Sequence, residues 1–121
     1  MSGIGDVLAL TIALETGDIH RFASAGKFAS YARMVDSRRE SNGKVKGVGS
    51  RKCGNKHLSW AFIEAAHYAV RYDPSIRRFY ERKRAKSLSV IAIKAVAHKL
   101  ARACYHIMRD GVPYDGARAF A

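Results

Sequence analysis

Residues 36–55 form a long segment without apolar periodicity between two stretches that are expected to be helical. The segment holds four glycines, six Lys or Arg residues and three serines. Connections inside a compact domain are typically about 4–6 residues long, and much longer loops tend to be functional or disordered. We therefore expect two helical parts joined by a flexible basic loop. A cationic loop with hydroxyl groups is suited to approaching a phosphodiester backbone.

Helices are expected on the N-terminal side of this loop. An apolar run over residues 6–16 stops at Gly17, a suitable C-cap, and a shorter helix is expected over residues 25–33. After the loop, residues 56–72 are apolar on nearly every side, which is typical of a buried central helix.

The rest of the chain also predicts helices. Asp73-Pro74 provides an N-cap followed by proline at the first helical position, so a basic helix is expected to run to about residue 86. Ser87 or Ser89 is expected to cap a last helix that ends at Asp110-Gly111. Residues after Pro113 are expected to fray. This last helix carries an apolar seam (Ile93, Ala97, Leu100, Cys104, Ile107) and a polar stripe (Lys94, His98, Arg102, Tyr105, Arg109).

No alternating pattern of strands competes with these helices. The 121 residues fit one all-α compact domain with a single modest core. No run of about 18 apolar residues predicts a membrane span, and the N-terminus lacks the layout of a signal peptide. Two distant cysteines and five scattered histidines form neither a disulfide framework nor a metal-ligand set, which fits a reducing cytoplasm.

The net charge of +12 is unevenly distributed. Residues 1–35 are neutral, whereas residues 36–56 and residues 71–86 each carry seven basic and two acidic residues. Two basic blocks beside a neutral one favour a nucleic-acid binder over a membrane binder, the alternative being a basic surface kept for solubility. The candidate DNA contacts are Gly3, Gly5, Arg38, Arg39, Lys44, Lys46, Arg51, Lys52, Lys56, Arg77, Arg78, Arg82 and Lys83.

The two glycines in that set belong to Gly3-Ile4-Gly5, which directly precedes a helix and resembles the hairpin of helix-hairpin-helix DNA-binding modules. There, backbone N–H groups at the helix start reach a phosphate. A plain glycine turn is the alternative. A helix-hairpin-helix also needs a helix before the hairpin, so the chain is expected to be truncated.

Ser37, Ser41 and Ser50 are the hydroxyl groups of the basic loop. A serine needs a base, a metal or a cluster of positive charge to become a nucleophile. Ser41 has the most basic surroundings, although most loop serines are structural. Most aromatic residues at helical spacing are expected in the core, and Tyr80 and Tyr105, which lie among Arg and Lys, are kept as candidates for stacking on bases.

Several short motifs occur in one order along residues 3–110. They are Gly3-Ile4-Gly5, residues 15–22 (ETGDIHRF), 29–32 (ASYA), 40–43 (ESNG), 52–55 (KCGN) and 97–101 (AHKLA). This ordered set resembles the C-terminal domain of transposases of insertion-sequence family 110, with its 116 and 902 relatives, the group that includes the pilin-inversion recombinase.

The resemblance implies a two-part recombinase. An N-terminal RuvC-like domain carries an Asp-Glu-Asp-Asp site for a divalent metal such as Mg²⁺, and it is expected to be absent from these residues. The C-terminal domain supplies a nucleophilic serine, which maps to Ser41. In the family's commoner form the serine is followed directly by glycine, whereas Asn42 intervenes here.

The resemblance also implies DNA as the partner, a bridge-type RNA, a homo-oligomer in the full-length enzyme and a bacterial cytoplasmic location. With no metal or other cofactor expected in this chain, we expect it to bind nucleic acid but not to recombine DNA by itself. The alternative is a non-enzymatic helical module that binds DNA or structural RNA.

Overall fold

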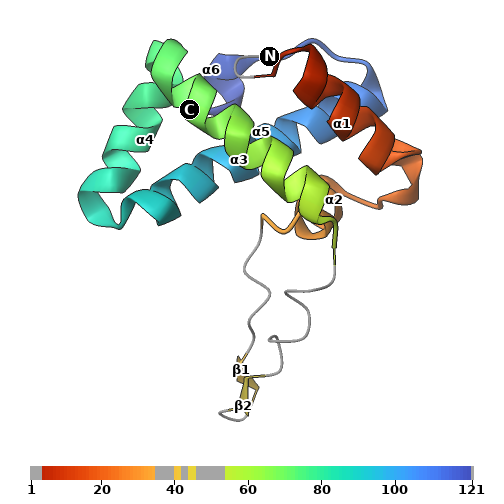
Figure 1. Cartoon of the computed structure of the whole chain (residues 1–121), viewed down its shortest axis with the longest axis horizontal. Helices are drawn as coiled ribbons and strands as arrows, with labels where there is room; N and C mark the ends of the chain where they lie inside the picture. The colour runs from red at the N-terminus through yellow and green to blue at the C-terminus, as the bar shows by residue number, and fades with distance from the viewer. Residues whose placement is uncertain (1–3, 35–39, 42–43, 46–53, 121) are drawn as a thin grey trace.

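A computed structural model describes residues 4–34, 40–41, 44–45 and 54–120, with the backbone alone for residues 40–41, 44–45 and 117. The expected all-α architecture is confirmed (Figure 1). The helices are α1 (Asp6–Thr16), the single 3-10 turn η1 (Ile19–Arg21), α2 (Ala25–Tyr31), α3 (Lys56–Tyr72), α4 (Pro74–Lys86), α5 (Ser89–Asp110) and α6 (Gly116–Ala119).

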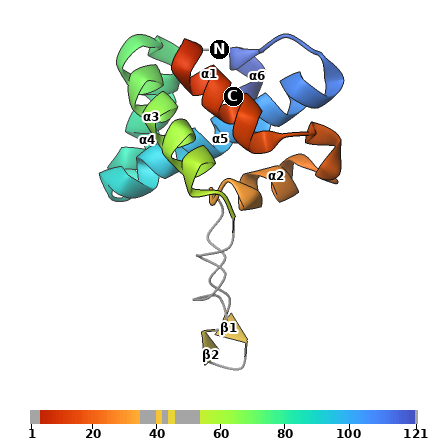
Figure 2. The same cartoon turned by 45° about the vertical axis from the view of Figure 1, so that its right-hand side comes forward.

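A short antiparallel hairpin lies inside the segment that joins α2 to α3. Strand β1 (Glu40–Ser41) pairs with β2 (Lys44–Val45), with Glu40 opposite Val45 and Ser41 opposite Lys44. In both Figure 1 and Figure 2 the two strands lie well away from the helices. The all-α expectation did not include this pairing, because two residues per strand are too few for an alternating pattern.

Helix α5, rather than α3, is the central element. It packs against α2, α3, α4, α6 and η1, whereas α1 packs against α3 (Figures 1 and 2). Phe28, Phe62, Leu100 and Tyr105 are fully or almost fully buried in the shared core. The expectation for α3 was therefore wrong in part: Leu58, Phe62, Ala65 and Ala69 are buried, but Trp60 and Tyr72 are 50% and 71% exposed.

The expected starts of α1, α3 and α4 are confirmed. Asn55 caps α3, and the Asp73 carboxylate accepts hydrogen bonds from the backbone N–H groups of Ser75 and Ile76 at the start of α4. Helix α2 is shorter than expected, because Arg33 adopts φ +62° and the Met34 N–H then bonds to the Ala29 carbonyl, which closes the helix end.

The expected serine cap of α5 was wrong. The N-cap is Leu88, which makes no side-chain capping bond. The Ser87 hydroxyl instead donates to the Lys83 carbonyl at 2.8 Å, and Ser89 is already inside the helix. Ser87 therefore closes α4 rather than opening α5.

The C-terminal tail is also more ordered than expected. Helix α6 follows Asp115, and Phe120 is 5% exposed with its ring 5.4 Å from the ring of Phe79. The tail thus contributes to the core next to α4.

Burial raises the pKa of the Cys104 thiol to about 12, so this cysteine is an unreactive packing residue. No helix in the described residues is long and apolar enough to cross a membrane.

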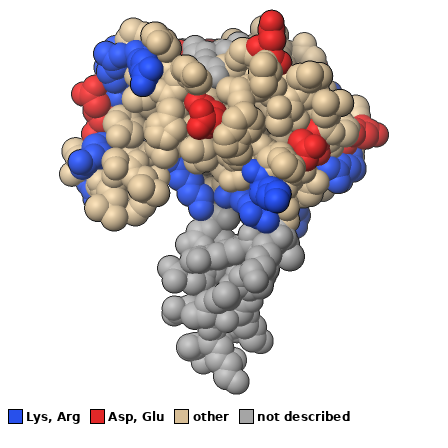
Figure 3. All heavy atoms as spheres, viewed as in Figure 1, with Lys and Arg blue, Asp and Glu red and all other residues tan. Residues whose placement is uncertain are grey.

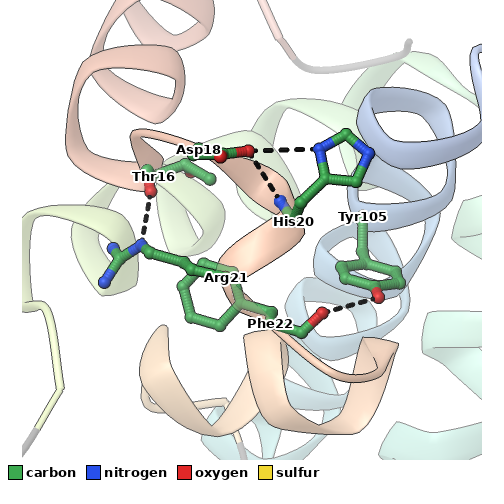
Figure 4. A network of polar contacts seen from close by, with 6 residues as sticks. All are labelled: Thr16, Asp18, His20, Arg21, Phe22 and Tyr105. Atoms are coloured by element: carbon green, nitrogen blue, oxygen red, sulfur yellow. Dashed lines mark hydrogen bonds and ion pairs between the residues drawn. The ribbon is translucent and has the colours of Figure 1, made fainter.

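Tyr105 ties α5 to the turn after η1. It is 1% exposed, and its hydroxyl donates a buried hydrogen bond to the Phe22 carbonyl at 3.0 Å (Figure 4). The interpretation of Tyr105 as a base-stacking residue was therefore wrong, because its ring is packed in the core near Phe28. Its position on the polar stripe of α5 suggested exposure, but α2 and η1 cover this part of the helix.

Candidate nucleic-acid interface

The segment between α2 and α3 re-enters the helical domain at Gly54 and Asn55. Gly54 has φ +103°, and a Cβ atom there would lie 2.6 Å from the Tyr31 carbonyl oxygen. Only glycine fits both this conformation and this close approach. The next backbone N–H, that of Asn55, donates to the same Tyr31 carbonyl at 2.7 Å. The two ends of the segment are thereby held together.

The side chain of Asn55 connects three helices. Its Oδ1 accepts from the backbone N–H groups of His57 and Leu58 at 2.9 and 3.0 Å, which caps α3. Its Nδ2 donates to Glu15 Oε1 at 2.9 Å and to Tyr31 Oη at 3.4 Å. Glu15, Tyr31 and Asn55 come from three of the short motifs described above, and the fold brings these motifs together. We call this set of contacts the Asn55 clamp.

Arg21 supports the clamp from η1. Its guanidinium carbon lies 4.5 Å from the centre of the Phe22 ring and 4.7 Å from that of Tyr31, and its Nε donates to the Thr16 carbonyl at 3.0 Å (Figure 4). Hydrogen bonds from Arg21 and then Asn55 lower the pKa of Tyr31. Nearby, hydrogen bonds from the His20 backbone and side chain lower the pKa of Asp18 and hold the start of η1.

A cluster of cations surrounds Phe79 at the packed faces of α4 and α5. The Lys99 ammonium lies 5.2 Å from the centre of the Phe79 ring, the Lys83 ammonium 5.7 Å and the Arg82 guanidinium carbon 6.0 Å. None of the three has a carboxylate within 4.0 Å among the residues that the structure describes. We call Arg82, Lys83 and Lys99 the Phe79 cluster.

The basic side chains of α5 continue from this cluster towards α2. Lys94, His98 and Arg102 lie on one stripe of the helix, and the Arg102 Nη1 is close to Gly26 at the start of α2. Burial and then the charges of Arg102, Lys99 and Lys94 lower the pKa of His98. Burial is the larger cause of this shift, and the neighbouring positive charges add to it. In Figure 3, Lys and Arg side chains gather along the lower edge of the helical domain.

The recorded ion pairs of the described part of the chain both involve histidine: His20 with Asp18 and His106 with Asp110. Among the described residues, no side chain of the Phe79 cluster or of the α5 stripe therefore forms an ion pair within 4.0 Å. Such a surface favours phosphate groups, which can take the place of the missing carboxylates.

The chain matches the Transposase IS116/IS110/IS902 family over residues 1–81. It is 28% identical over 116 residues to the uncharacterized 43.6 kDa protein of insertion element IS110 of Streptomyces coelicolor, covering 95% of this chain and 29% of that protein. It is 32% identical over 124 residues to the uncharacterized 42 kDa protein of insertion element IS900 of Mycobacterium paratuberculosis, covering 100% of this chain and 31% of that protein.

A transposase of Sinorhizobium fredii, described as putative and named y4qE, is 31% identical over 105 residues, covering 84% of this chain and 27% of that protein. The chain belongs to the Transposase IS116/IS110/IS902 family. It spans less than a third of the length of these curated relatives. No solved structure matches it significantly.

Many of the predicted contacts of this transposase-family domain lie outside the described residues: Gly3, Arg38, Arg39, Lys46, Arg51 and Lys52. Ser41 and Lys44 are described by their backbone alone, as paired residues of β1 and β2. The assignment of Ser41 as nucleophile therefore stays a prediction.

The remaining predicted contacts have different surroundings. Lys56 starts α3 and is exposed, as are Arg78, Arg82 and Lys83 on α4. Arg77 is exposed but engaged, because its Nε donates to the Val70 carbonyl at 3.1 Å and its Nη2 donates to the Arg71 carbonyl. Arg77 thus closes the C-terminal end of α3 and is less free to bind a phosphate.

Gly5 is the exposed N-cap of α1, without a side chain to cap the helix. The first turn of α1 carries Asp6, whose carboxylate is itself a favourable charge at the positive end of a helix. The helix-hairpin-helix interpretation stays a prediction, since Gly3 lies outside the described residues.

The candidate contacts predicted from the sequence did not include Lys94, Lys99 and Arg102, which the structure adds to the basic surface. The α5 stripe was visible in the sequence as polar residues at helical spacing. What the sequence could not show is that Lys99 meets Lys83 of another helix at Phe79, because that contact depends on how α4 packs against α5.

Proposed function

We propose that this transposase-family domain binds DNA through a basic surface that includes the Phe79 cluster, the α5 stripe and the basic residues of the segment between α2 and α3. The observation that carries the proposal is the convergence of Lys83 and Lys99 from two helices over one ring, with no described carboxylate beside them. Phosphate contacts of this kind orient a protein on DNA without reading its sequence.

We further propose that Ser41 acts as the nucleophile in the complete transposase. The Ser41 Oγ attacks a DNA phosphorus atom, forms an Oγ–P bond and breaks the bond from phosphorus to one deoxyribose oxygen. The serine proton leaves to a base, and the departing sugar oxygen takes up a proton. Basic residues nearby in the sequence, such as Arg39 and Lys44, stabilise the negative charge that develops on the phosphate.

The proposed reaction also uses a divalent metal ion such as Mg²⁺, which is bound outside this domain. Among the described residues there is no group of three or more His, Cys, Asp or Glu side chains that could hold a metal ion. The donor groups of the described residues do not fit a metal site. The metal is assigned to the acidic RuvC-like domain that the family resemblance implies.

The RNA partner and the homo-oligomer are likewise proposals for the complete transposase, as is a cytoplasmic location with binding to the nucleoid. Family membership supports these proposals, and the basic surface supports a polyanionic partner. A bridge-type RNA would use the same phosphate-binding residues as DNA, because both are polyanions.

The DNA-binding proposal is tested with two variants that remove positive charge from different places, one at the Phe79 cluster and one further along α5. Lys99→Gln combined with Lys83→Gln should weaken binding to a duplex on the order of tenfold or more at moderate salt. Arg109→Gln, ten residues further along α5 and packed over the Tyr105 ring, should have a smaller effect. Equal losses from the cluster variant and the Arg109 variant would contradict the assigned surface.

The serine proposal needs a complete enzyme of this family that carries this domain. Ser41→Ala should abolish both strand exchange and the covalent protein–DNA adduct while leaving DNA affinity unchanged. Strand exchange that persists in this variant, at an unaltered protein level, would remove Ser41 from the mechanism. Binding without an adduct under any complementation would instead indicate a non-enzymatic nucleic-acid module.

A further inference from the structure

An apolar stripe runs along the exposed side of α1. Val7, Leu10 and Leu14 lie on one face at helical spacing, and they are 72%, 60% and 71% exposed. Exposed hydrophobic residues scattered singly are ordinary, but a contiguous apolar patch on a small domain marks an interaction site. This stripe therefore requires an explanation that the DNA-binding surface does not supply.

The stripe borders a groove between α1 and α3. The groove has a volume of about 540 Å³, and its apolar lining includes Val7, Leu8, Trp60, Tyr68 and Tyr72. Tyr68 and Tyr72 stack with their ring centres 6.5 Å apart. We call this groove, with the stripe of α1 beside it, the α1–α3 groove.

The charged residues of the groove are acidic. Asp6 and Glu64 line it, and among the described residues no Lys or Arg does, although the chain as a whole carries a net charge of +12. A polyanion is disfavoured at such a surface despite the exposed aromatic rings. The groove is instead suited to an apolar partner whose edges are basic.

The same chain carries a surface of that description at the junction of α4 and α5. Leu88, Val90 and Ile91 are 70%, 72% and 56% exposed, and they form what we call the α4–α5 corner. Arg84 and Lys86 precede the corner and are exposed, and Lys94 lies one turn after Ile91. The corner and α1 lie at opposite ends of the helical domain in Figure 1, so one molecule cannot join them within itself.

We propose that the α4–α5 corner of one copy of this chain docks into the α1–α3 groove of a second copy. The apolar side chains of the corner fill the groove, and its basic edges meet Asp6 and Glu64. This contact joins two different surfaces, so it is heterologous and adds copies head to tail unless the rotation closes a ring. The proposal goes beyond DNA binding and does not depend on it.

Sedimentation of the purified chain over a range of concentrations tests the proposal. The average mass of the wild type should rise with concentration beyond that of a dimer, because a head-to-tail dimer still has one free groove and one free corner. Val7→Asp, in the groove, and Val90→Asp, in the corner, should each leave the chain monomeric. Both positions are highly exposed, so folding should be retained and is checked by circular dichroism.

An equimolar mixture of the two variants decides the pairing. Each variant retains the surface that the other has lost, so the mixture should form a 1:1 complex and nothing larger. Val112→Asp, a matched change at an exposed valine outside both surfaces, should behave as the wild type. A Val90→Asp variant that still associates alone, or a mixture that stays monomeric, would overturn the pairing of groove with corner.

A wild type that stays monomeric at every concentration would also overturn the proposal. The partner of the groove would then be a helix of a different protein. The outcome is separable from DNA binding, since Val7→Asp should bind a duplex as tightly as the wild type. Loss of DNA binding in this variant, with association intact, would place the groove in the DNA surface instead.

Discussion

Asn55 Nδ2 donates a hydrogen bond to Glu15 Oε1 at 2.9 Å, and this contact joins the residue that caps α3 to the last turn of α1. The two residues are 40 positions apart. The same asparagine holds Tyr31 near the end of α2. The clamp thus fixes where the segment between α2 and α3 leaves and re-enters the domain, and this segment carries the proposed nucleophile.

Asn55→Ala should lower the free energy of unfolding by about 1–3 kcal/mol, because the variant loses an N-cap and strands the polar atoms of its partners. Asn55→Ser is the matched control: its hydroxyl retains a capping oxygen but cannot reach Glu15. Urea unfolding should rank the serine variant between the wild type and the alanine variant. If the Asn55→Ala variant is as stable as the wild type, the Asn55 clamp does not stabilise the domain.

Gly54→Ala should destabilise the domain more than Gly17→Ala. Both glycines have positive φ angles, +103° and +65°, but only at position 54 does a Cβ meet backbone, at 2.6 Å from the Tyr31 carbonyl oxygen. The unfavourable φ alone costs about 1–2 kcal/mol for a non-glycine residue, and the clash adds to it at Gly54. Thermal unfolding of both variants measures the difference, and equal losses would contradict the close approach.

Tyr105→Phe should cost about 1–3 kcal/mol, because it leaves the buried Phe22 carbonyl without its donor. Tyr80→Phe on α4, where the side chain is only partly buried, is the comparison and should be nearly neutral. The measurement is the urea midpoint at constant slope. If Tyr105→Phe leaves the free energy of unfolding unchanged, a water molecule replaces the Tyr105 hydroxyl as the donor to the Phe22 carbonyl.

The lowered pKa of His98 predicts that the folded protein loses stability as the pH falls. Burial and the charges of Arg102, Lys99 and Lys94 hold its pKa in the folded state below the usual value of about 6.5. As the pH falls, His98 is therefore protonated in the unfolded chain before it is protonated in the folded protein. The free energy of unfolding decreases from a pH of about 6.5 down to the folded-state pKa of His98. His98→Gln should reduce this dependence. Unfolding curves from neutral to mildly acidic pH measure the slope.

The sequence predicted the elements whose boundaries are local. Asp73-Pro74 starts α4, and Gly17 and Gly111 end α1 and α5, because caps and breakers act within a few residues. The wrong prediction of the α5 cap also concerns only a few residues. Two serines, Ser87 and Ser89, lie near the start of α5, and only the structure shows that the Ser87 hydroxyl donates to the Lys83 carbonyl of α4.

Properties that depend on packing could not be predicted in this way. Tyr105 lies on a stripe of polar residues, yet α2 and η1 bury it, and Phe120 is held by Phe79 of a helix more than thirty residues earlier. The same limit applies to the Phe79 cluster. Charge counting located the basic helix α4, but that Lys83 and Lys99 both lie near the Phe79 ring required the tertiary structure.

The salt dependence of DNA binding by the wild-type chain tests the central claim most directly. If the basic surface neutralises about five phosphates, a plot of the logarithm of the affinity against the logarithm of the salt concentration should have a slope of about −4 to −5 for duplex DNA. The affinity should also be similar for unrelated duplex sequences, since the contacts are made to phosphates. A slope near zero would contradict the account, because no polyanion would then be bound through these cations.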